Sequence, residues 1–462
     1  MKKRLTARIG LLIRSLSCFL LIAMLFPLAA CQSFKTEQEE NVARYGSRGR
    51  QLALEIAEKF PFRSAGSPEE KALADYLADE LKKLGYEPEI RPFSYQVDGR
   101  QKQSQNVILH IPGRGFSPDP LDPEDPMAAS KEMQAVSQLD GRRLIYAAHY
   151  DTAWSRAEAE EKDQAQEMAA VDENGLPVEG ADLPPLSGTD GLDDNAAAVA
   201  VLLSVAQVFR TTRPAYDIDL VFFGAGHDHY AGAEAIAANL SGADIERTDA
   251  MINLDQIYAG DRVYAHAGWN SLREGRQKDY AARRKLYECT DIYYDNLLLT
   301  RNGFALFTNQ SGFFRKVPGE EREAVYREWS EKSGDHSPFD RLGIPIVFFD
   351  SASYDLASPD EPLKESEDPY FSSVGGMIGG SGYDKSSILT AYFVPEGVAK
   401  GEKVFGSESA TDAGSTGETS PTDSDPDHYR KDTDRLEIRI NNLAFILSEL
   451  SLKAPPGAKI RD

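Results

Sequence analysis

The chain has 462 residues, of which 41% are hydrophobic and 27% charged, which is enough for one large or two modest globular domains with a hydrophobic core. This composition excludes a wholly disordered chain and a coiled coil. The formal net charge of −23 argues against a nucleic-acid partner and against adsorption on anionic lipid headgroups.

The N-terminus has the order of a bacterial export signal. A basic segment, "MKKRLTARIGLLIR", precedes an apolar segment that ends in small residues before Cys31. Leu28-Ala29-Ala30-Cys31 resembles the lipobox of bacterial lipoproteins, in which the chain is cut before the cysteine and that cysteine carries the lipid. An ordinary signal peptide and an uncleaved anchor helix are the alternatives.

We therefore expect residues 1–30 to be a lipoprotein signal peptide and residues 31–46 to be a polar tether. The protein would be exported and lipid-anchored through Cys31 to a bacterial cell membrane, on the periplasmic side or at the cell surface. A lipidated Cys31 leaves Cys289 without a partner, so a large core rather than disulfides must stabilise the fold.

Two helix patterns follow within residues 47–84. The second begins with Ser67 as a predicted N-cap and Pro68 at the first helical position, and it ends at Gly85. Glu69 and Glu70 are expected to interact with the positive end of this helix.

Short apolar strands then alternate with helices along the chain. The expected strands are 87–97, 105–111, 142–150, 217–226, 250–257 and 344–350. Helical stretches are expected at 195–210, 231–240 and 435–450. Such alternation predicts an α/β protein, a three-layer α/β/α sandwich around a mostly parallel mixed sheet, with ligands at the carboxyl ends of the strands.

Three polar segments interrupt this pattern, near 114–140, 153–190 and 353–427. Their composition predicts surface insertions in a single domain spanning residues 47–452, followed by a tail at 453–462. The glycine-rich run 374–386 lacks the features of a phosphate-binding loop and is expected to be a flexible loop.

Histidines and carboxylates gather where the expected strands end or where the next helix begins. They are His149 and Asp151 in "IYAAHYDT", Asp193 and Asp194 in "GLDDN", His227 in "GAGHDH", Asp255 in "INLDQI", and His428 ahead of the last helix. A histidine at a strand end is commonly a hydrogen-bonded structural residue, but five candidate ligands in compatible places indicate a zinc site.

The same motifs occur in an order that resembles the di-zinc aminopeptidase family, which also includes glutamate carboxypeptidases and glutaminyl cyclases. The collinear set includes "AAHYDT", "GLDDN", "LVFFGAG", "INLD" and "SGDHSPFDRLGIP". The resemblance implies a zinc-exopeptidase-like fold, two divalent metal ions, most simply zinc, and a peptide substrate.

The resemblance also implies roles for individual residues. The implied metal ligands are His149, Asp194 as the bridging carboxylate, His227, Asp255 and His428. Asp151 would orient the imidazole of His149. Asp335 and His336 in "SGDHSPF" would lie beside the site in a structural or substrate-facing role.

One stretch departs from the family pattern. Relatives have Gly-Ala-Glu-Glu at this strand end, where the first Glu is the general base and the second binds metal, whereas this chain has Gly226 and His227. Imidazole is an ordinary zinc ligand, so His227 can replace a carboxylate, but Gly226 cannot accept a proton. Asp228 is the expected substitute base, with His229 as an alternative, although neighbouring side chains in an extended segment point apart.

The sequence thus predicts a metal-dependent exopeptidase, most simply an aminopeptidase that acts through metal-activated water. The first alternative is an impaired relative that serves as a binding or scaffolding lipoprotein, and the second is a glutaminyl-cyclase-like acyltransferase. If only the base is missing, restoring Glu at positions 226 and 227 should raise activity. The sequence does not indicate an oligomeric state.

Overall fold

The computed structural model describes most of the chain beyond residue 47, and the described residues belong to the compact unit Ser47–Asp462. The described ranges are 48–120, 127–169, 189–271, 279–298, 305–308, 313–316, 323–326, 333–354, 363–393 and 434–462. The predicted signal peptide, Cys31, the tether and His428 lie outside these ranges, so the expectations attached to them remain predictions.

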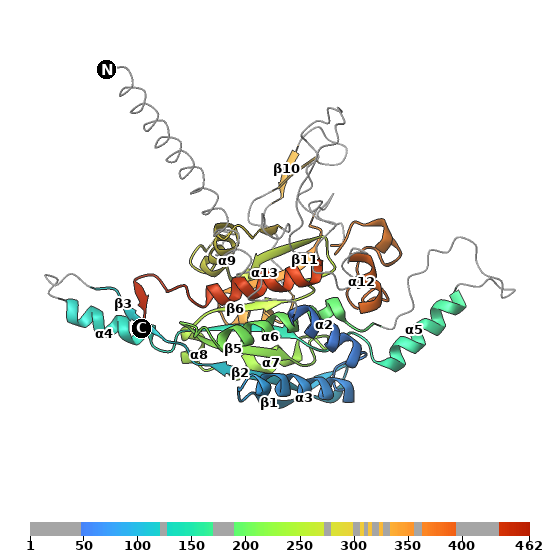
Figure 1. Ribbon diagram of the computed structural model, residues 1–462, viewed down its shortest axis with the longest axis horizontal. Coiled ribbons are helices and arrows are strands. Elements are labelled where there is room, and N and C mark those ends of the chain that lie inside the picture. Colours follow the sequence, from blue (N-terminus) through green and yellow to red (C-terminus); the bar gives the residue numbers. More distant parts are fainter. Residues whose placement is uncertain are drawn as a thin grey trace, which may run out of the picture. The chain divides into compact units, whose positions relative to one another are not determined.

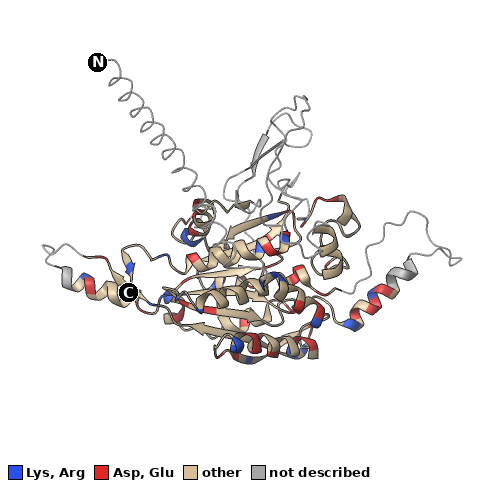
Figure 2. Cartoon of the chain, viewed as in Figure 1, with Lys and Arg blue, Asp and Glu red and all other residues tan. Residues whose placement is uncertain are grey.

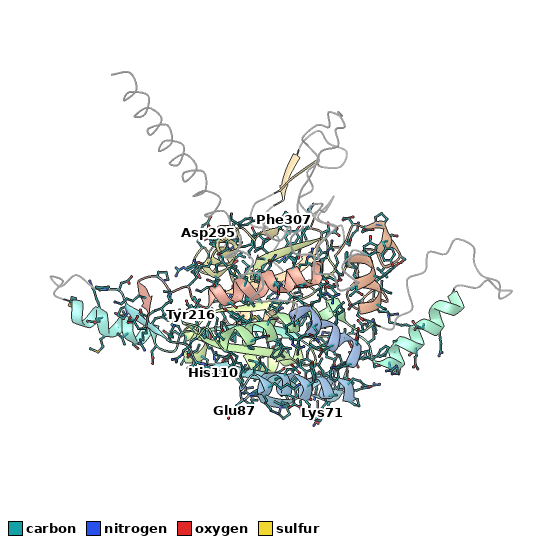
Figure 3. The ribbon with its side chains drawn as sticks, in the orientation of Figure 1. Lys71, Glu87, His110, Tyr216, Asp295 and Phe307 are labelled. Carbon is teal, nitrogen blue, oxygen red and sulfur yellow. The ribbon has the colours of Figure 1, made fainter. Side chains whose placement is uncertain are left out.

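Twelve strands occur among the described residues. They are β1 (Glu89–Val97), β2 (Arg100–Ile111), β3 (Phe116–Pro118), β4 (Arg143–His149), β5 (Asp217–Phe223), β6 (Thr248–Leu254), β7 (Arg262–Ala267), β8 (Leu306–Thr308), β9 (Phe313–Lys316), β10 (Glu323–Tyr326), β11 (Ile346–Ala352) and β12 (Ala458–Ile460). Eight of them form one sheet in the order β1-β2-β5-β4-β6-β11-β7-β8. The sheet therefore has β1 and β8 at its two edges, and Figure 3 shows Lys71 and Glu87 near the β1 side and Phe307 of β8 on the opposite side.

The helices in the described ranges complete the sandwich. They are α2 (Arg48–Lys59), α3 (Pro68–Lys83), α4 (Ala128–Leu139), α5 (Arg156–Ala169), α6 (Ala197–Phe209), α7 (Ala231–Ala237), α8 (Gly242–Arg247), α9 (Arg284–Asp295), α11 (Ser337–Arg341), α12 (Ser386–Phe393) and α13 (Arg435–Leu450), with short helical turns η1 (Leu192–Ala196), η2 (Trp269–Ser271) and η3 (Pro369–Val374). Charged residues gather on outer helices such as α3 and α5, while the central strands are mostly uncharged (Figure 2).

Four parallel strands at the centre of the sheet position the site. β5, β4, β6 and β11 run parallel to one another, whereas β2 pairs antiparallel with β1 and β5, and β7 pairs antiparallel with β11. Because parallel strands end at the same edge of a sheet, His149 at the end of β4 and the residues that follow β5 and β6 meet there. The sheet is mixed with a parallel centre, as the sequence predicts.

Each face of the sheet is covered by helices. On one face α2, α6 and α13 lie side by side (Figure 1), and the hydroxyl of Tyr146 on β4 donates to the carbonyl of Leu447 on α13. On the other face α7, α8 and α11 pack over a core that includes Val221, Phe223 and Phe339. The three-layer α/β/α sandwich is therefore present.

Local sequence explains the helices that frame this core. Ser67 caps α3 by accepting a hydrogen bond from the Glu70 amide at 3.0 Å, and Pro68 occupies the first helical position, as predicted. The segment Leu192–Phe209, which contains α6, is apolar enough to cross a membrane, but 94% of it is buried inside the protein. Its composition is accounted for by its position in the core between the sheet and its neighbouring helices.

Candidate metal centre

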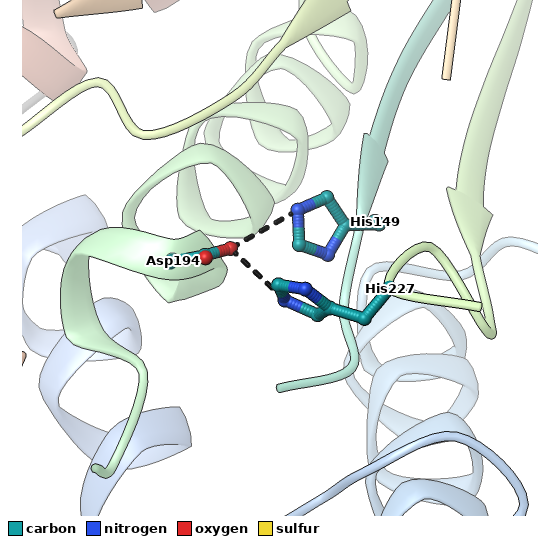
Figure 4. A group of neighbouring side chains, drawn as sticks. All are labelled: His149, Asp194 and His227. Atoms are coloured by element: carbon teal, nitrogen blue, oxygen red, sulfur yellow. Dashed lines mark ion pairs between the residues drawn. The ribbon is translucent and has the colours of Figure 1, made fainter. Parts of the chain in front are cut away.

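Three side chains from different elements converge at the carboxyl edge of the sheet. Nε2 of His149, at the end of β4, lies 3.2 Å from Oδ1 of Asp194 in η1. Nε2 of His227, in the loop after β5, lies 3.3 Å from the same oxygen. Figure 4 shows both imidazoles directed at the Asp194 carboxylate. Their donor atoms all lie within 4.8 Å of one another, so this group can hold a metal ion.

Asp255 joins the group from the end of β6. Its Oδ1 lies 3.1 Å from Nε2 of His149. The adjacent Gln256 donates to Oδ2 of Asp194 at 3.0 Å, and its backbone amide donates to the side chain of Asn195. A cis peptide bond joins Asp194 to Asn195. Four of the five predicted ligands thus lie together, and the fifth, His428, is outside the described ranges.

Asp151 links His149 to the loop after β5. Its Oδ1 lies 3.4 Å from Nδ1 of His149, which is the contact that the predicted orienting role requires. The same carboxylate accepts hydrogen bonds from the backbone amides of Gly226, at 2.7 Å, and His227, at 3.1 Å. Because one side chain holds both a ring and a loop, it fixes the two imidazoles relative to each other.

Glu70 of α3 holds the loop after β5 through a hydrogen bond, a role that the sequence did not predict. Its carboxylate is 1% exposed and accepts from the Ala225 amide at 2.9 Å and from the Ser104 hydroxyl at 2.7 Å. Burial raises its pKa to about 8. Its position in the first turn of α3 suggested only an interaction with the helix end, and no local signal indicates the contact with residue 225.

The glycine-rich run 374–386, which the sequence predicts to be a flexible loop, contributes a residue to the support of the site. Its Asp384 is fully buried and accepts hydrogen bonds from the amides of Asp193 at 2.8 Å and Asp194 at 3.3 Å. Burial, together with the charges of Asp193 and Asp194, raises the pKa of Asp384 well above its usual range. Gly380 lies so close that a Cβ added there would be 3.8 Å from Oδ2 of Asp194. This run therefore lies against Asp194.

The donor set fits a zinc ion. Imidazole nitrogens and carboxylate oxygens are ordinary zinc ligands, and ligands held at bonds of about 2.0–2.1 Å in a tetrahedron stand about 3.3 Å apart. The separations of Asp194 from His149 and His227, 3.2 and 3.3 Å, match that spacing. Asp194 is 3% exposed, so its charge needs a compensating cation.

A cavity of about 240 Å³ opens beside this group. Its lining includes the four clustered side chains and also Gly226, His229, Tyr230, Gln256 and Asp335. Asp335 is 1% exposed, and within the described part of the chain neither of its carboxylate oxygens has a hydrogen-bond donor. Burial raises its pKa to about 7.

The remaining predicted residues lie around the cavity in different ways. Oδ2 of Asp228 accepts from the Tyr95 hydroxyl at 2.6 Å and from Nζ of Lys102 at 2.8 Å, and Asp228 does not line the cavity. Its predicted role as substitute base therefore has no geometric support. His336 is buried against Phe348 beside the cavity, with ring centroids 4.8 Å apart.

Comparison with known families identifies the class of protein. The model of peptidase family M28 matches residues 132–369, which is more than half of the chain and contains the four clustered side chains. The chain belongs to peptidase family M28.

Individual relatives are distant. The alkaline phosphatase isozyme conversion protein of Escherichia coli is 24% identical over 319 residues, which cover 69% of this chain and 76% of that protein. A zinc aminopeptidase from Bacillus subtilis is 12% identical with a TM-score of 0.43, covering 75% of this chain and 92% of that chain. The glutaminyl cyclase of Porphyromonas gingivalis is 18% identical with a TM-score of 0.40, covering 67% and 85%. The family assignment rests on the matched segment.

Asp384 lies outside that segment and provides a test of the site's support. Asp384→Ala removes the acceptor for the buried amides of Asp193 and of the candidate ligand Asp194, so zinc affinity should fall about 10- to 100-fold. Competition with a chromophoric chelator measures the affinity. Asp368→Ala, which removes an exposed helix cap in the same part of the chain, is the matched control and should leave it unchanged. Equal affinity in both variants would contradict the supporting role.

Proposed function

We propose that the protein is a zinc-dependent aminopeptidase that removes N-terminal residues from peptides. The observation that carries this proposal is the convergence of His149, Asp194, His227 and Asp255 at one cavity in a chain of peptidase family M28. Two ions, with His428 as a ligand of the second, complete the proposed centre.

Each residue has a definite part in this proposal. When bound, a divalent ion polarises the scissile carbonyl and acidifies water. His149 would bind through Nε2, because this nitrogen faces Asp194 and Asp255, whereas Nδ1 lies 3.4 Å from the Asp151 carboxylate. Asp194 and Asp255 supply carboxylate oxygens, and His227 supplies the second imidazole.

The cavity favours the end of a peptide over its middle. Its volume of about 240 Å³ is below the ~300–1,000 Å³ typical of pockets that enclose a whole drug-sized ligand. The first residue of a peptide fits a cavity of this size.

The impaired-enzyme alternative has one observation in its favour, the glycine at position 226, where relatives of this family carry the general base. A peptidase without a proton acceptor would lose ~10²–10⁴ in rate and could persist as a metal-bearing binding protein.

Turnover tests the proposal. The full chain, purified in detergent, should release the first residue from dipeptides and aminoacyl p-nitroanilides but not from their N-acetylated forms. 1,10-Phenanthroline should abolish the release and added zinc should restore it. His149→Ala, which removes a predicted ligand, is the inactive control. Stoichiometric zinc without turnover would instead support the binding protein, and cyclisation of N-terminal glutaminyl peptides would support a glutaminyl cyclase.

We propose in addition that the protein is exported and anchored by lipid on Cys31, on the strength of the lipobox-like sequence alone. Cells that express the chain and are fed labelled palmitate should incorporate label into it, and Cys31→Ser should abolish incorporation and release the protein from membranes. Cys18→Ser is the control that should keep the label. Label retained by Cys31→Ser would contradict the anchor.

A further inference from the structure

The loop after β5 leaves no room for a side chain at position 226. A Cβ added to Gly226 would lie 2.6 Å from Cβ and 2.7 Å from Cγ of His149, closer than non-bonded carbon atoms approach one another in proteins. His149 is itself held by Asp151 and by the cluster, so it cannot move aside cheaply. A glutamate restored at position 226 would therefore require the loop or His149 to shift, and a proton acceptor is expected from another element.

Asp228 on the same loop is already engaged. Its carboxylate accepts hydrogen bonds from the Tyr95 hydroxyl and the Lys102 ammonium group, and it does not line the cavity. Ala225, His229 and Tyr230 have positive φ angles of 53°, 57° and 59°, so the backbone turns sharply on both sides of Asp228. This conformation orients the Asp228 side chain toward β1 and β2.

Asp335 is the carboxylate that reaches the cavity without an assigned partner. It lies two residues before α11, and it lines the cavity together with His149, His227 and Asp255. A buried carboxylate without donors costs several kcal/mol, so a folded protein retains one where a ligand or a reaction uses it. Asp335 does not belong to the compact donor group of His149, Asp194 and His227 among the described residues, which places it beside the metal ligands.

We propose that Asp335 is the proton acceptor of the reaction and replaces, from a different loop, the carboxylate that cannot be accommodated at position 226. This inference rests on the proposed aminopeptidase function. As water attacks the scissile carbonyl carbon, the new C–O bond forms and one water proton moves to the Asp335 carboxylate. The same proton then passes to the peptide nitrogen as the C–N bond breaks, so the amine leaves neutral and the carboxylate is regenerated.

His229 is the competing candidate because it also lines the cavity. It differs from Asp335 in being exposed to solvent at the cavity rim. A buried acceptor keeps the proton near the reacting atoms, whereas an exposed imidazole exchanges protons with bulk water. The geometry therefore favours Asp335, and His229→Asn forms a separate arm of the test.

The experiment compares Asp335→Asn with Asp340→Asn in the full chain. Asp340 lies five residues further on, and its carboxylate accepts the amides of Trp269 and Asn270 away from the cavity. Asp335→Asn should lower kcat by ~10²–10⁴ while KM stays within a few-fold, and Asp340→Asn should keep wild-type kcat. Zinc affinity, measured on the metal-free proteins by chelator competition, should be the same in all three.

A second variant separates proton transfer from a structural role. Asp335→Ala opens space at the carboxylate position, and added formate should restore part of its activity in a concentration-dependent way, whereas formate should not stimulate wild type. Circular dichroism and zinc affinity confirm that both variants are folded.

The contrary results are distinct. Loss of zinc affinity in Asp335→Asn would make the residue a metal ligand, and a rise in KM at unchanged kcat would make it a substrate-binding group; both overturn the inference. Wild-type kcat in Asp335→Asn would also overturn the inference. So would a loss of kcat in His229→Asn together with no rescue of Asp335→Ala by formate. Those outcomes leave aminopeptidase activity in the wild type intact. Absence of turnover by the wild type itself would overturn the proposed function and this inference together.

Discussion

The burial of the Asp194 carboxylate between two imidazoles is the interaction on which the rest of the site depends. An uncompensated charge at 3% exposure is costly, and the surrounding structure is arranged to hold this one in place. Gln256 donates a hydrogen bond to Oδ2 of Asp194, and Asp384 accepts a hydrogen bond from the backbone amide of Asp194. A divalent cation between Asp194, His149 and His227 would offset the remaining negative charge and explain why both rings point at one oxygen.

The sheet brings these groups together from positions far apart in sequence. Four parallel strands end at one edge, so side chains from residues 149, 227 and 255 meet without any local sequence contact. Arg63 reinforces the edge, because its buried guanidinium donates to the carbonyl of Tyr150, which follows the candidate ligand His149, and to that of Gly191, three residues before the candidate ligand Asp194.

Sequence patterns predicted the parts of the fold that depend on local chemistry. Apolar runs gave the central strands β4, β5, β6 and β11, and the last helix was predicted with the bounds that α13 has, because its apolar periodicity is a local signal. β7 was missed because "RVYAHA" is short and contains a histidine, His266, whose burial depends on a partner, Asp350, on the adjacent strand. The convergence of His149, Asp194, His227 and Asp255 was predictable because the parallel strands that carry or precede them were.

The supporting residues were not predictable because their roles arise from tertiary packing. Glu70 resembled a helix-end charge, and Asp384 lay in a glycine-rich run without periodicity. Asp228 attracted attention because it adjoins His227, yet an adjacent side chain turns away while Asp335, more than a hundred residues later, faces the cavity. Proximity along the chain is a poor guide to proximity at the edge of a parallel sheet.

X-ray diffraction from zinc-soaked crystals of the protein, with data collected on both sides of the zinc absorption edge, tests the metal centre most directly. The account predicts an anomalous peak about 2.0–2.2 Å from Nε2 of His149, Nε2 of His227 and a carboxylate oxygen of Asp194. Full-occupancy zinc elsewhere, with the two imidazoles still paired directly to Asp194, would contradict it.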